Sequence, residues 1–199
     1  MTPPTPLSRP RGLLLDMDGT LTEPMLDFSR IKREMGIGDR PILEALAAMS
    51  PAERCAAQTV LHRHEERAAE HSTLNPGCRE LLAWLDANGI ASALITRNSL
   101  TSVQTVLRRH GLTIDILITR DDGRYKPDPQ PLRLACERLR LRPSEVWMVG
   151  DGQYDVEAGR AAGVRTMWVS HGRARPFEAE PWGVARDLAE LLTLLRNAS

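Results

Sequence analysis

Two aspartates stand two residues apart at the end of an apolar run near the start of the chain. A Leu-Leu-Leu run over residues 13–15 precedes Asp16, and Asp18 follows after one methionine. Three leucines bounded by a turn signal are typical of a parallel strand that is buried on both faces. Residues two apart in an extended chain point the same way, so both carboxylates would face one side. Because buried carboxylates need a cation or donors nearby, the pair predicts a chemical site rather than a simple Asp-Gly turn.

Further polar residues follow other predicted strands or lie in a loop beside one. They are Thr96, Arg97 and Asn98 at the end of the strand predicted over residues 90–96, Lys126 in a proline-rich loop, and Asp151 and Asp155 after residues 146–149. The carboxyl ends of parallel strands share one edge of a sheet, where such sheets bind their ligands. We therefore expect these side chains to form a single site with Asp16 and Asp18.

The residue types at this site are typical of phosphate chemistry. Carboxylates that meet at one point repel each other, and a hard divalent cation such as Mg²⁺ relieves this with oxygen ligands and a substrate phosphate. Lys126, one of only two lysines in the chain, adds positive charge. The Thr96 hydroxyl and the amides of the helix start that follows it can hold a phosphate. The alternatives are a helix cap for Thr96 and a solvated loop charge for Lys126.

The elements that must position these residues follow from hydrophobic periodicity. From residue 75 onward, helical stripes alternate with short apolar runs, which is typical of an α/β doubly wound, Rossmann-type parallel sheet. Strands are predicted over residues 13–15, 90–96, 114–119, 146–149 and 166–169, and helices over 78–85, 99–109, 132–139, 155–162 and 188–195.

The segment between the first strand and residue 73 has no strand-like run and is predicted to be all-helical. Apolar residues recur at helical spacing over 28–35 and 42–49, and Ser50-Pro51-Ala52-Glu53 has the capping-box pattern that starts a helix reaching about His71. We predict a flexible leader at 1–11, an α/β core at 12–22 and 73–199, and a helical cap at 23–72. An insertion at this point of the chain would lie over the carboxyl ends of the strands and act as a lid.

Composition narrows the class of protein. The 199 residues include 26 basic and 26 acidic side chains, which gives no electrostatic reason to expect a nucleic acid or a membrane surface as partner. No apolar stretch approaches the ~20 residues that span a bilayer, and the proline-rich start lacks the apolar core of a signal peptide. We expect a cytoplasmic protein, monomeric or weakly homodimeric. Cys55, Cys78 and Cys136 form no CxxC pair and are expected to be reduced, mostly buried thiols.

Four motifs carry a resemblance to a known family. DMDGTLT, ITRN, KPDP and GDGQYD, in this order and at these strand ends, resemble the motifs of the haloacid dehalogenase (HAD) superfamily of phosphohydrolases. The resemblance runs from Leu13 to the closing helix, and the joint pattern is specific although each motif alone is weak. A helical segment after the first motif is similar to the branch that contains phosphoglycolate phosphatase and β-phosphoglucomutase.

The resemblance implies roles for the site residues. Asp16 would be the nucleophile that forms an aspartyl phosphate, Asp18 the general acid and base, and Lys126 the residue that stabilises charge. Thr96 would bind the phosphate, with Arg97 and Asn98 beside it.

The resemblance also implies a Mg²⁺ site. Asp16, Asp151 and the backbone carbonyl of Asp18 would bind the cation, with Asp155 beside it or one shell out. A carboxylate at position 18 favours a metal-dependent phosphatase over the dehalogenating members. Gly152 is a departure, because many relatives carry a serine or threonine after the GD pair.

We therefore expect a Mg²⁺-dependent phosphatase that acts on a small phosphorylated metabolite. The alternatives are a sugar phosphomutase, a phospho-receiver module and a non-catalytic binding protein; the length of the chain and its helical insertion disfavour the receiver. No motif identifies the substrate. His62, His64 and His71 are expected at the surface rather than as metal ligands, and Arg30, Lys32 and Arg33 as a solvated face that an acidic or phosphate-rich substrate could also use.

Overall fold

The computed structural model describes residues 8–198, which fold into two compact units. The sheet unit contains the chain up to Pro24, Thr73–Arg97 and the chain from Thr113 onward; the helical unit contains Met25–Ser72 and Asn98–Leu112. Residues 1–7 of the predicted leader lie outside the described residues. At the end of that leader, the Arg11 amide donates to the Glu145 carbonyl at 2.7 Å, so the chain is already attached to the sheet unit there.

The sheet unit is built on six parallel strands in the order β3-β2-β1-β4-β5-β6. Five of them lie at or within about two residues of the runs predicted from the sequence, and β6 is an addition at the edge. The strands are β1 Gly12–Leu15, β2 Ala91–Ile95, β3 Ile116–Ile118, β4 Val146–Gly150, β5 Arg165–Val169 and β6 Gly183–Ala185.

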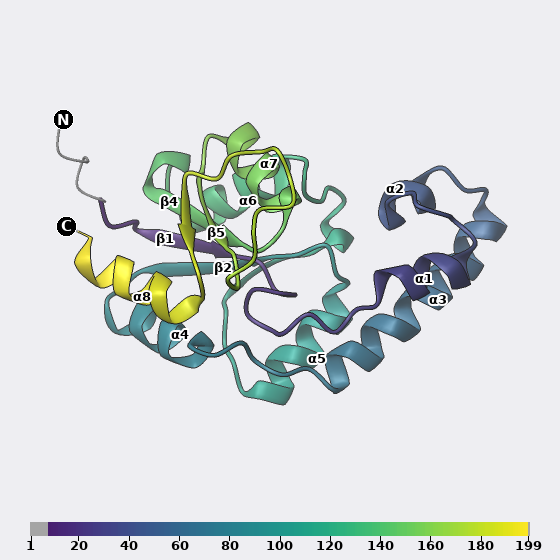
Figure 1. The fold of residues 1–199 in the computed structure, drawn as a ribbon, viewed down its shortest axis with the longest axis horizontal. Coiled ribbons are helices and arrows are strands. Elements are labelled where there is room, and N and C mark those ends of the chain that lie inside the picture. The colour runs from purple at the N-terminus through teal and green to yellow at the C-terminus, as the bar shows by residue number, and fades with distance from the viewer. Residues whose placement is uncertain (1–7, 199) are drawn as a thin grey trace. The chain divides into compact units, whose positions relative to one another are not determined.

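Helices cover both faces of this sheet. α4 (Cys78–Ala87) and α8 (Leu188–Asn197) pack together on one face, and α6 (Gln130–Leu139) and α7 (Gln153–Ala162) pack together on the other (Figure 1). Two 3-10 turns, η1 (Arg120–Asp122) and η2 (Pro143–Glu145), lie in the connections. The predicted fold class, a doubly wound parallel α/β sheet, is confirmed. The core under α6 and α7 includes Leu14, Ala93, Ile118, Leu132, Cys136, Met148 and Ala158.

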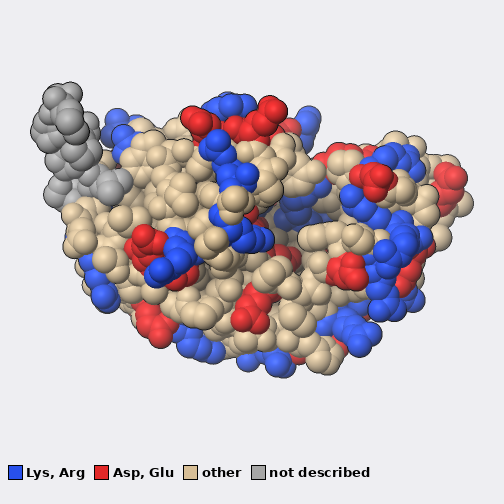
Figure 2. Space-filling view, in the orientation of Figure 1, with Lys and Arg blue, Asp and Glu red and all other residues tan. Residues whose placement is uncertain are grey.

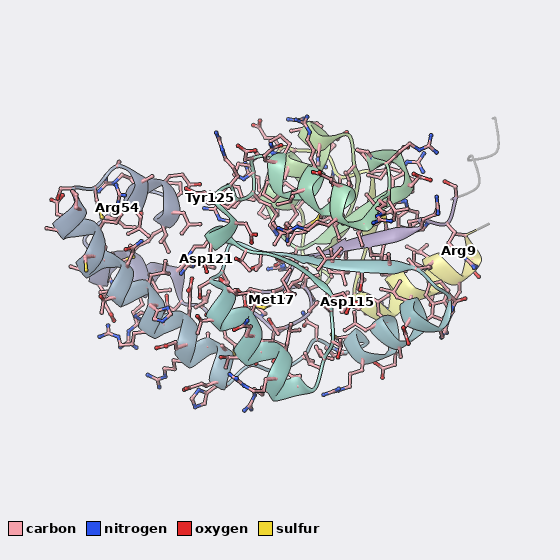
Figure 3. The ribbon with its side chains drawn as sticks, turned by 180° about the vertical axis from the view of Figure 1, so that it is seen from behind. Arg9, Met17, Arg54, Asp115, Asp121 and Tyr125 are labelled. Carbon is pink, nitrogen blue, oxygen red and sulfur yellow. The ribbon has the colours of Figure 1, made fainter. Side chains whose placement is uncertain are left out.

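The helical unit consists of α1 (Phe28–Met35), α2 (Ile42–Ala47), α3 (Pro51–Glu70) and α5 (Leu100–His110). The long helix α3 contacts the other three. It begins with the capping box predicted at Ser50 and Glu53. Near its start, Arg54 donates to the carbonyls of Leu46 and Met49 at 2.9 Å each, which joins α3 to the end of α2 (Figure 3).

The surface is electrostatically mixed. On the face drawn in Figure 2, lysine and arginine side chains are interspersed with aspartate and glutamate, in keeping with equal numbers of basic and acidic residues. Among residues 8–198, none of the helices combines the length and the apolar character needed to cross a bilayer.

Candidate active site

The strand order places the candidate site at one point of the sheet edge. The chain runs from β1 through β2 to β3 on one side, then crosses to β4 on the other side of β1. Crevices at such switch points, outside the carboxyl ends of the strands, are where open α/β sheets bind ligands. Asp16 follows β1 directly, and Asp151 follows β4 directly.

Three carboxylates meet at this point. One oxygen each from Asp16, Asp151 and Asp155 lies within 4.8 Å of the others. Asp16 and Asp155 are buried. Two glycines leave the room for this arrangement. A Cβ atom on Gly150 would lie 2.2 Å from the Asp155 Cγ, and one on Gly19, whose φ is +77°, would lie 2.4 Å from an Asp151 carboxylate oxygen.

Lys126 bridges two of the three carboxylates. Its Nζ donates to Asp16 Oδ1 at 2.6 Å and to Asp155 Oδ1 at 2.5 Å, and its side chain is almost completely buried. The Gly152 amide donates to the other oxygen of Asp155 at 3.1 Å. The lysine predicted from the KPDP motif thus lies within the aspartate cluster rather than in solvent.

The pKa shifts reflect the crowding of charge in this site. Burial raises the pKa of Asp16 well above its ordinary value; Lys126 opposes this shift, and Asp155 and Asp151 add to it. Burial lowers the pKa of Lys126, but Asp155 and Asp16 together outweigh burial and leave it above its ordinary value. Lys126 therefore stays charged at neutral pH.

Asp151 has partners of its own that the sequence did not indicate. Burial raises its pKa, as does the neighbouring charge of Asp155, while Arg173 opposes the shift. Arg173 Nη2 lies 3.2 Å from Asp151 Oδ2, and Trp168 Nε1 donates to the Asp151 carbonyl at 3.0 Å. Arg173 lies in the loop after β5, where no motif stands out. Its position shortly after β5, the strand next to β4, is the sequence feature that could have identified Arg173 as a site residue.

The donor set fits a Mg²⁺ ion. Three carboxylates against the Lys126 ammonium and the Arg173 guanidinium still leave negative charge to be compensated, and carboxylate oxygens are the ligands that this cation prefers. The Asp18 side chain does not belong to this carboxylate group, and its Oδ1 accepts from the Thr22 hydroxyl at 3.4 Å. Its predicted contribution to the metal, through the backbone carbonyl, stays a prediction.

Thr96, Arg97 and Asn98 follow β2, as the sequence predicted. Thr96 is buried, and its amide donates to the Ile118 carbonyl at 3.0 Å. Asn98 is also buried and is the first residue of the second segment of the helical unit. The roles of all three in binding phosphate or substrate stay predictions.

Arg97 has a set of contacts that sequence reasoning missed. Its Cζ lies 4.9 Å from the ring centroid of Tyr125 and 4.2 Å from that of Tyr154, and its guanidinium donates to the Lys126 carbonyl. Tyr125 lies in the loop between β3 and α6 (Figure 3). Cation–π contacts of this kind stabilise by about 0.5–2 kcal/mol each. Arg97 therefore anchors the loop that carries Lys126.

Comparison with known proteins shows the family. The profile of haloacid dehalogenase-like hydrolases matches residues 22–169. A haloacid dehalogenase-like hydrolase domain-containing protein of Arabidopsis thaliana is 32% identical, over 96% of this chain and 84% of its own length. The N-acetylmuramic acid 6-phosphate phosphatase of Pseudomonas putida is 34% identical, over 88% of this chain and 90% of its own. The chain therefore belongs to the haloacid dehalogenase-like hydrolase family, and the resemblance seen in its motifs is confirmed.

A solved structure supports the fold. The crystal structure of a hydrolase from Pseudomonas syringae superposes with a TM-score of 0.81, at 22% identity, and covers 94% of this chain and 99% of that chain. At this identity the likeness concerns the fold alone.

Proposed function

We propose that this chain is a Mg²⁺-dependent phosphatase that hydrolyses a small phosphorylated metabolite through a phosphoryl group held on Asp16. The broader class rests on its relatives: the chain is a hydrolase of a family in which similar proteins are named phosphatases, including a phosphoglycolate phosphatase of Chromobacterium violaceum. The observation that supports the finer proposal is the buried contact of Lys126 with Asp16 and Asp155, with Asp151 beside them.

The first half of the proposed reaction transfers the phosphoryl group to the protein. A carboxylate oxygen of Asp16 attacks phosphorus, the bond from phosphorus to the ester oxygen breaks, and Asp18 gives that oxygen a proton. The Lys126 ammonium, held against Asp16, offsets the negative charge on the phosphoryl oxygens.

The second half returns Asp16 to its starting state. Asp18, now ionised, accepts a proton from a water molecule as that water attacks phosphorus. The bond between phosphorus and the Asp16 oxygen breaks, and inorganic phosphate leaves. Splitting hydrolysis into two displacements replaces one difficult step with two easier ones.

The residues that would hold the cation are Asp16, Asp151 and the backbone carbonyl of Asp18, with Asp155 close by. A bound Mg²⁺ would supply positive charge for the phosphate oxygens in addition to that of Lys126. The carboxylate group described above offers oxygen ligands for it.

We also propose that residues 23–72 form the cap of this phosphatase and that residues 12–22 and 73–199 form its catalytic core. Two facts support this division. The helical segment is inserted directly after the strand that precedes Asp16, and its helices belong to one compact unit, which also includes Asn98–Leu112. A cap of this kind excludes water and selects the substrate.

The test is hydrolysis of p-nitrophenyl phosphate, then of a panel of metabolite phosphates, with Mg²⁺ and with EDTA. We expect turnover with Mg²⁺ only, and a loss of at least about a thousandfold in Asp16→Asn. The matched control is Asp115→Asn, which changes an exposed aspartate of the sheet unit and should keep full activity. Equal activity of the Asp16 variant and the intact chain contradicts the proposal; isomerisation of a sugar phosphate would point to a mutase.

A further inference from the structure

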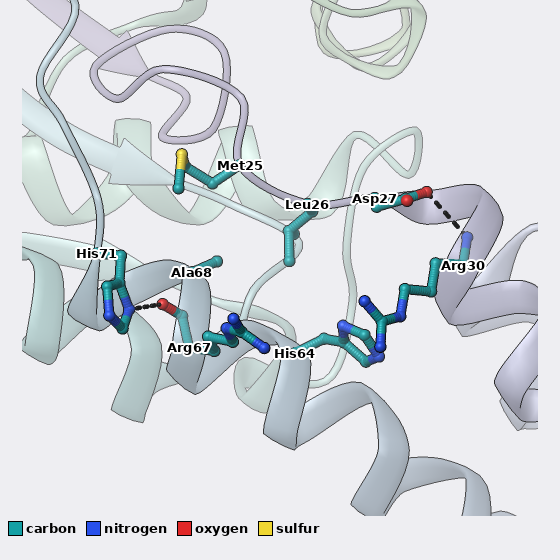
Figure 4. Close-up of a pocket in the computed structure, with 8 residues that line it drawn as sticks. All are labelled: Met25, Leu26, Asp27, Arg30, His64, Arg67, Ala68 and His71. Carbon is teal, nitrogen blue, oxygen red and sulfur yellow. Dashed lines mark hydrogen bonds between the residues drawn. The ribbon is translucent and has the colours of Figure 1, made fainter.

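The helical unit contains a cavity of about 330 Å³ that none of the motifs explains. Its walls come from two segments of that unit, the chain that enters and begins α1 and the last two turns of α3 (Figure 4). This volume is at the lower end of the range for small-molecule sites. The lining residues are Met25, Leu26, Asp27, Arg30, His64, Arg67, Ala68 and His71.

The wall formed by α3 is a single stripe of the helix. His64, Arg67, Ala68 and His71 are spaced by three, one and three residues, so they share one face. The buried residues of α3 include Leu61, which lies on the same side of the helix as His64 and Ala68. Three of the four side chains that α3 contributes to the cavity can donate hydrogen bonds. His64 was expected at the surface, but its side chain is only 16% exposed.

Charged side chains contribute to the cavity lining, and Arg67 is its cation without an acidic partner among the described residues. Arg30 and Arg67 are permanent cations, and the lining holds one carboxylate, Asp27, which accepts from the Arg30 amide at 2.9 Å as the N-cap of α1. Both Arg30 and His64 are paired with Glu34, whose carboxylate lies 2.9 Å from Arg30 Nε and 3.0 Å from His64 Nε2. Arg67, by contrast, has no carboxylate within ion-pair distance in the part of the chain that the structure describes. The His71 ring is oriented by a 2.8 Å contact between its Nδ1 and the Arg67 carbonyl.

The remaining lining is apolar, from Met25, Leu26 and Ala68. We propose that this cavity binds a small organic anion, with its carboxylate or phosphate head on the Arg67 guanidinium and the His71 imidazole and its apolar body against these three side chains. Arginine forms strong, charge-assisted hydrogen bonds with such head groups. The anion has two conceivable sources, an acid group on the enzyme's own substrate or a free organic acid. The first source rests on the proposed phosphatase function.

The direct test is binding of benzoate to the full chain, with neutral benzamide as the comparison. Arginine and histidine side-chain signals in NMR spectra report where each compound binds. We expect benzoate to shift the Arg67 and His71 signals, benzamide to shift them little, and Arg67→Gln to weaken benzoate binding by about tenfold or more. Arg33→Gln removes an exposed arginine of α1 outside the cavity and should bind benzoate as the intact chain does. Arg67→Lys, which keeps the charge, should retain part of the affinity.

Kinetics then separate the two sources. If the anion is part of the substrate, Arg67→Gln raises the KM for a carboxylate-bearing ester such as phosphoglycolate and leaves that for p-nitrophenyl phosphate unchanged. If the anion is a free acid, both KM values are unchanged and the variant loses only the effect of benzoate. Because benzoate binding is measured without turnover, a failure of the phosphatase proposal would not hide it. Equal binding of benzoate to the intact chain and to Arg67→Gln, or equal binding of benzamide and benzoate, overturns the proposal.

Discussion

Lys126 is the residue on which the charge balance of the site depends. It is the only buried ammonium among the described residues, and it donates to two buried carboxylates. Removing one partner of a buried ion pair leaves uncompensated charge and costs about 3–5 kcal/mol. We expect Lys126→Met to lower kcat by about 10²–10³ and the free energy of unfolding by about 3 kcal/mol or more.

The other lysine of the chain is the control for this prediction. Lys32 lies on α1 and donates to the Asp39 carbonyl at 3.0 Å. Lys32→Met should change the free energy of unfolding by less than about 1 kcal/mol, as is usual for exposed contacts. Urea unfolding and steady-state kinetics of the two variants make the comparison. Two variants of equal stability and activity would show that Lys126 has no special role.

Two neighbouring glycines differ sharply in the space around them. A Cβ atom on Gly150 would lie 2.2 Å from the Asp155 Cγ, whereas one on Gly152 has its nearest neighbour at 3.4 Å. We expect Gly150→Ala to cost about 1–3 kcal/mol of stability by overpacking and to displace Asp155. Gly152→Ala and Gly152→Ser should stay within about 0.5 kcal/mol of the intact chain. Thermal unfolding compares the three variants; a stable, fully active Gly150→Ala would refute this.

At this scale the proximity of four charged residues was predictable from the sequence, but the contacts that hold them were not. Asp16, Lys126, Asp151 and Asp155 could be placed together because each follows a strand or lies in a loop at one sheet edge. The contacts of Arg97 with the rings of Tyr125 and Tyr154, and the contact of Arg173 with Asp151, depend on loop conformations that no periodic pattern in the sequence predicts.

Among the elements, α1 and α3 are joined by a cluster of charges around Glu34. Its carboxylate lies 2.9 Å from Arg30 Nε on its own helix, and 2.6 Å from Arg63 Nη2 and 3.0 Å from His64 Nε2 on α3. The hydrogen bond from His64, followed by that from Arg30, lowers the pKa of Glu34 from 4.5 to about 2.

This shift predicts a pH dependence. A carboxyl group with a lower pKa in the folded chain stabilises it above the unfolded value of 4.5, and that stability is lost as the pH falls toward 2. We expect Glu34→Gln to be less stable than the intact chain at pH 7, with a smaller difference at pH 3. Glu70→Gln, at the exposed end of α3, should show no such trend. Urea unfolding at both pH values measures this, and a difference that does not shrink at pH 3 would contradict it.

The elements with strong local patterns were predictable. The helix expected over 28–35 is α1, and the capping box at Ser50 starts α3. The edge strand β6 was missed because its three residues, Gly183–Ala185, are too few to show a period. The strand expected over 114–119 is shorter, Ile116–Ile118, because only these residues pair with β2.

For the whole molecule, the three cysteines report on folding. The expectation of mostly buried thiols holds for Cys78 and Cys136, but Cys55 is exposed on α3. Burial raises the pKa values of Cys78 and Cys136 to about 11, so both thiols stay protonated and unreactive at pH 8. We expect a thiol reagent to modify one cysteine rapidly in the folded chain and all three in denaturant. Rapid modification of all three without denaturant would mean that the core opens readily.

The division of the molecule into units was less accessible from sequence than its fold class. The alternation of helices and strands, which indicates a parallel sheet, can be seen in the sequence because the hydrophobic period of each element lies within its own residues. The structure groups α5 with the helical unit, where it contacts α3, and the Ser72 hydroxyl lies 2.9 Å from His110 Nε2. Contacts between segments so far apart in the chain leave no pattern in either segment alone.

The most direct test of the account is to trap the phosphoryl group on Asp16. In Asp18→Asn, p-nitrophenyl phosphate can still react because its leaving group needs no proton, while the second step lacks its base. After an acid quench, peptide mass spectrometry should then find one phosphoryl group per chain on the peptide that contains Asp16, and none when Asp16 is also changed to Asn. Hydrolysis that proceeds with no phosphoryl group on Asp16, or with one on another residue, would contradict the proposed mechanism.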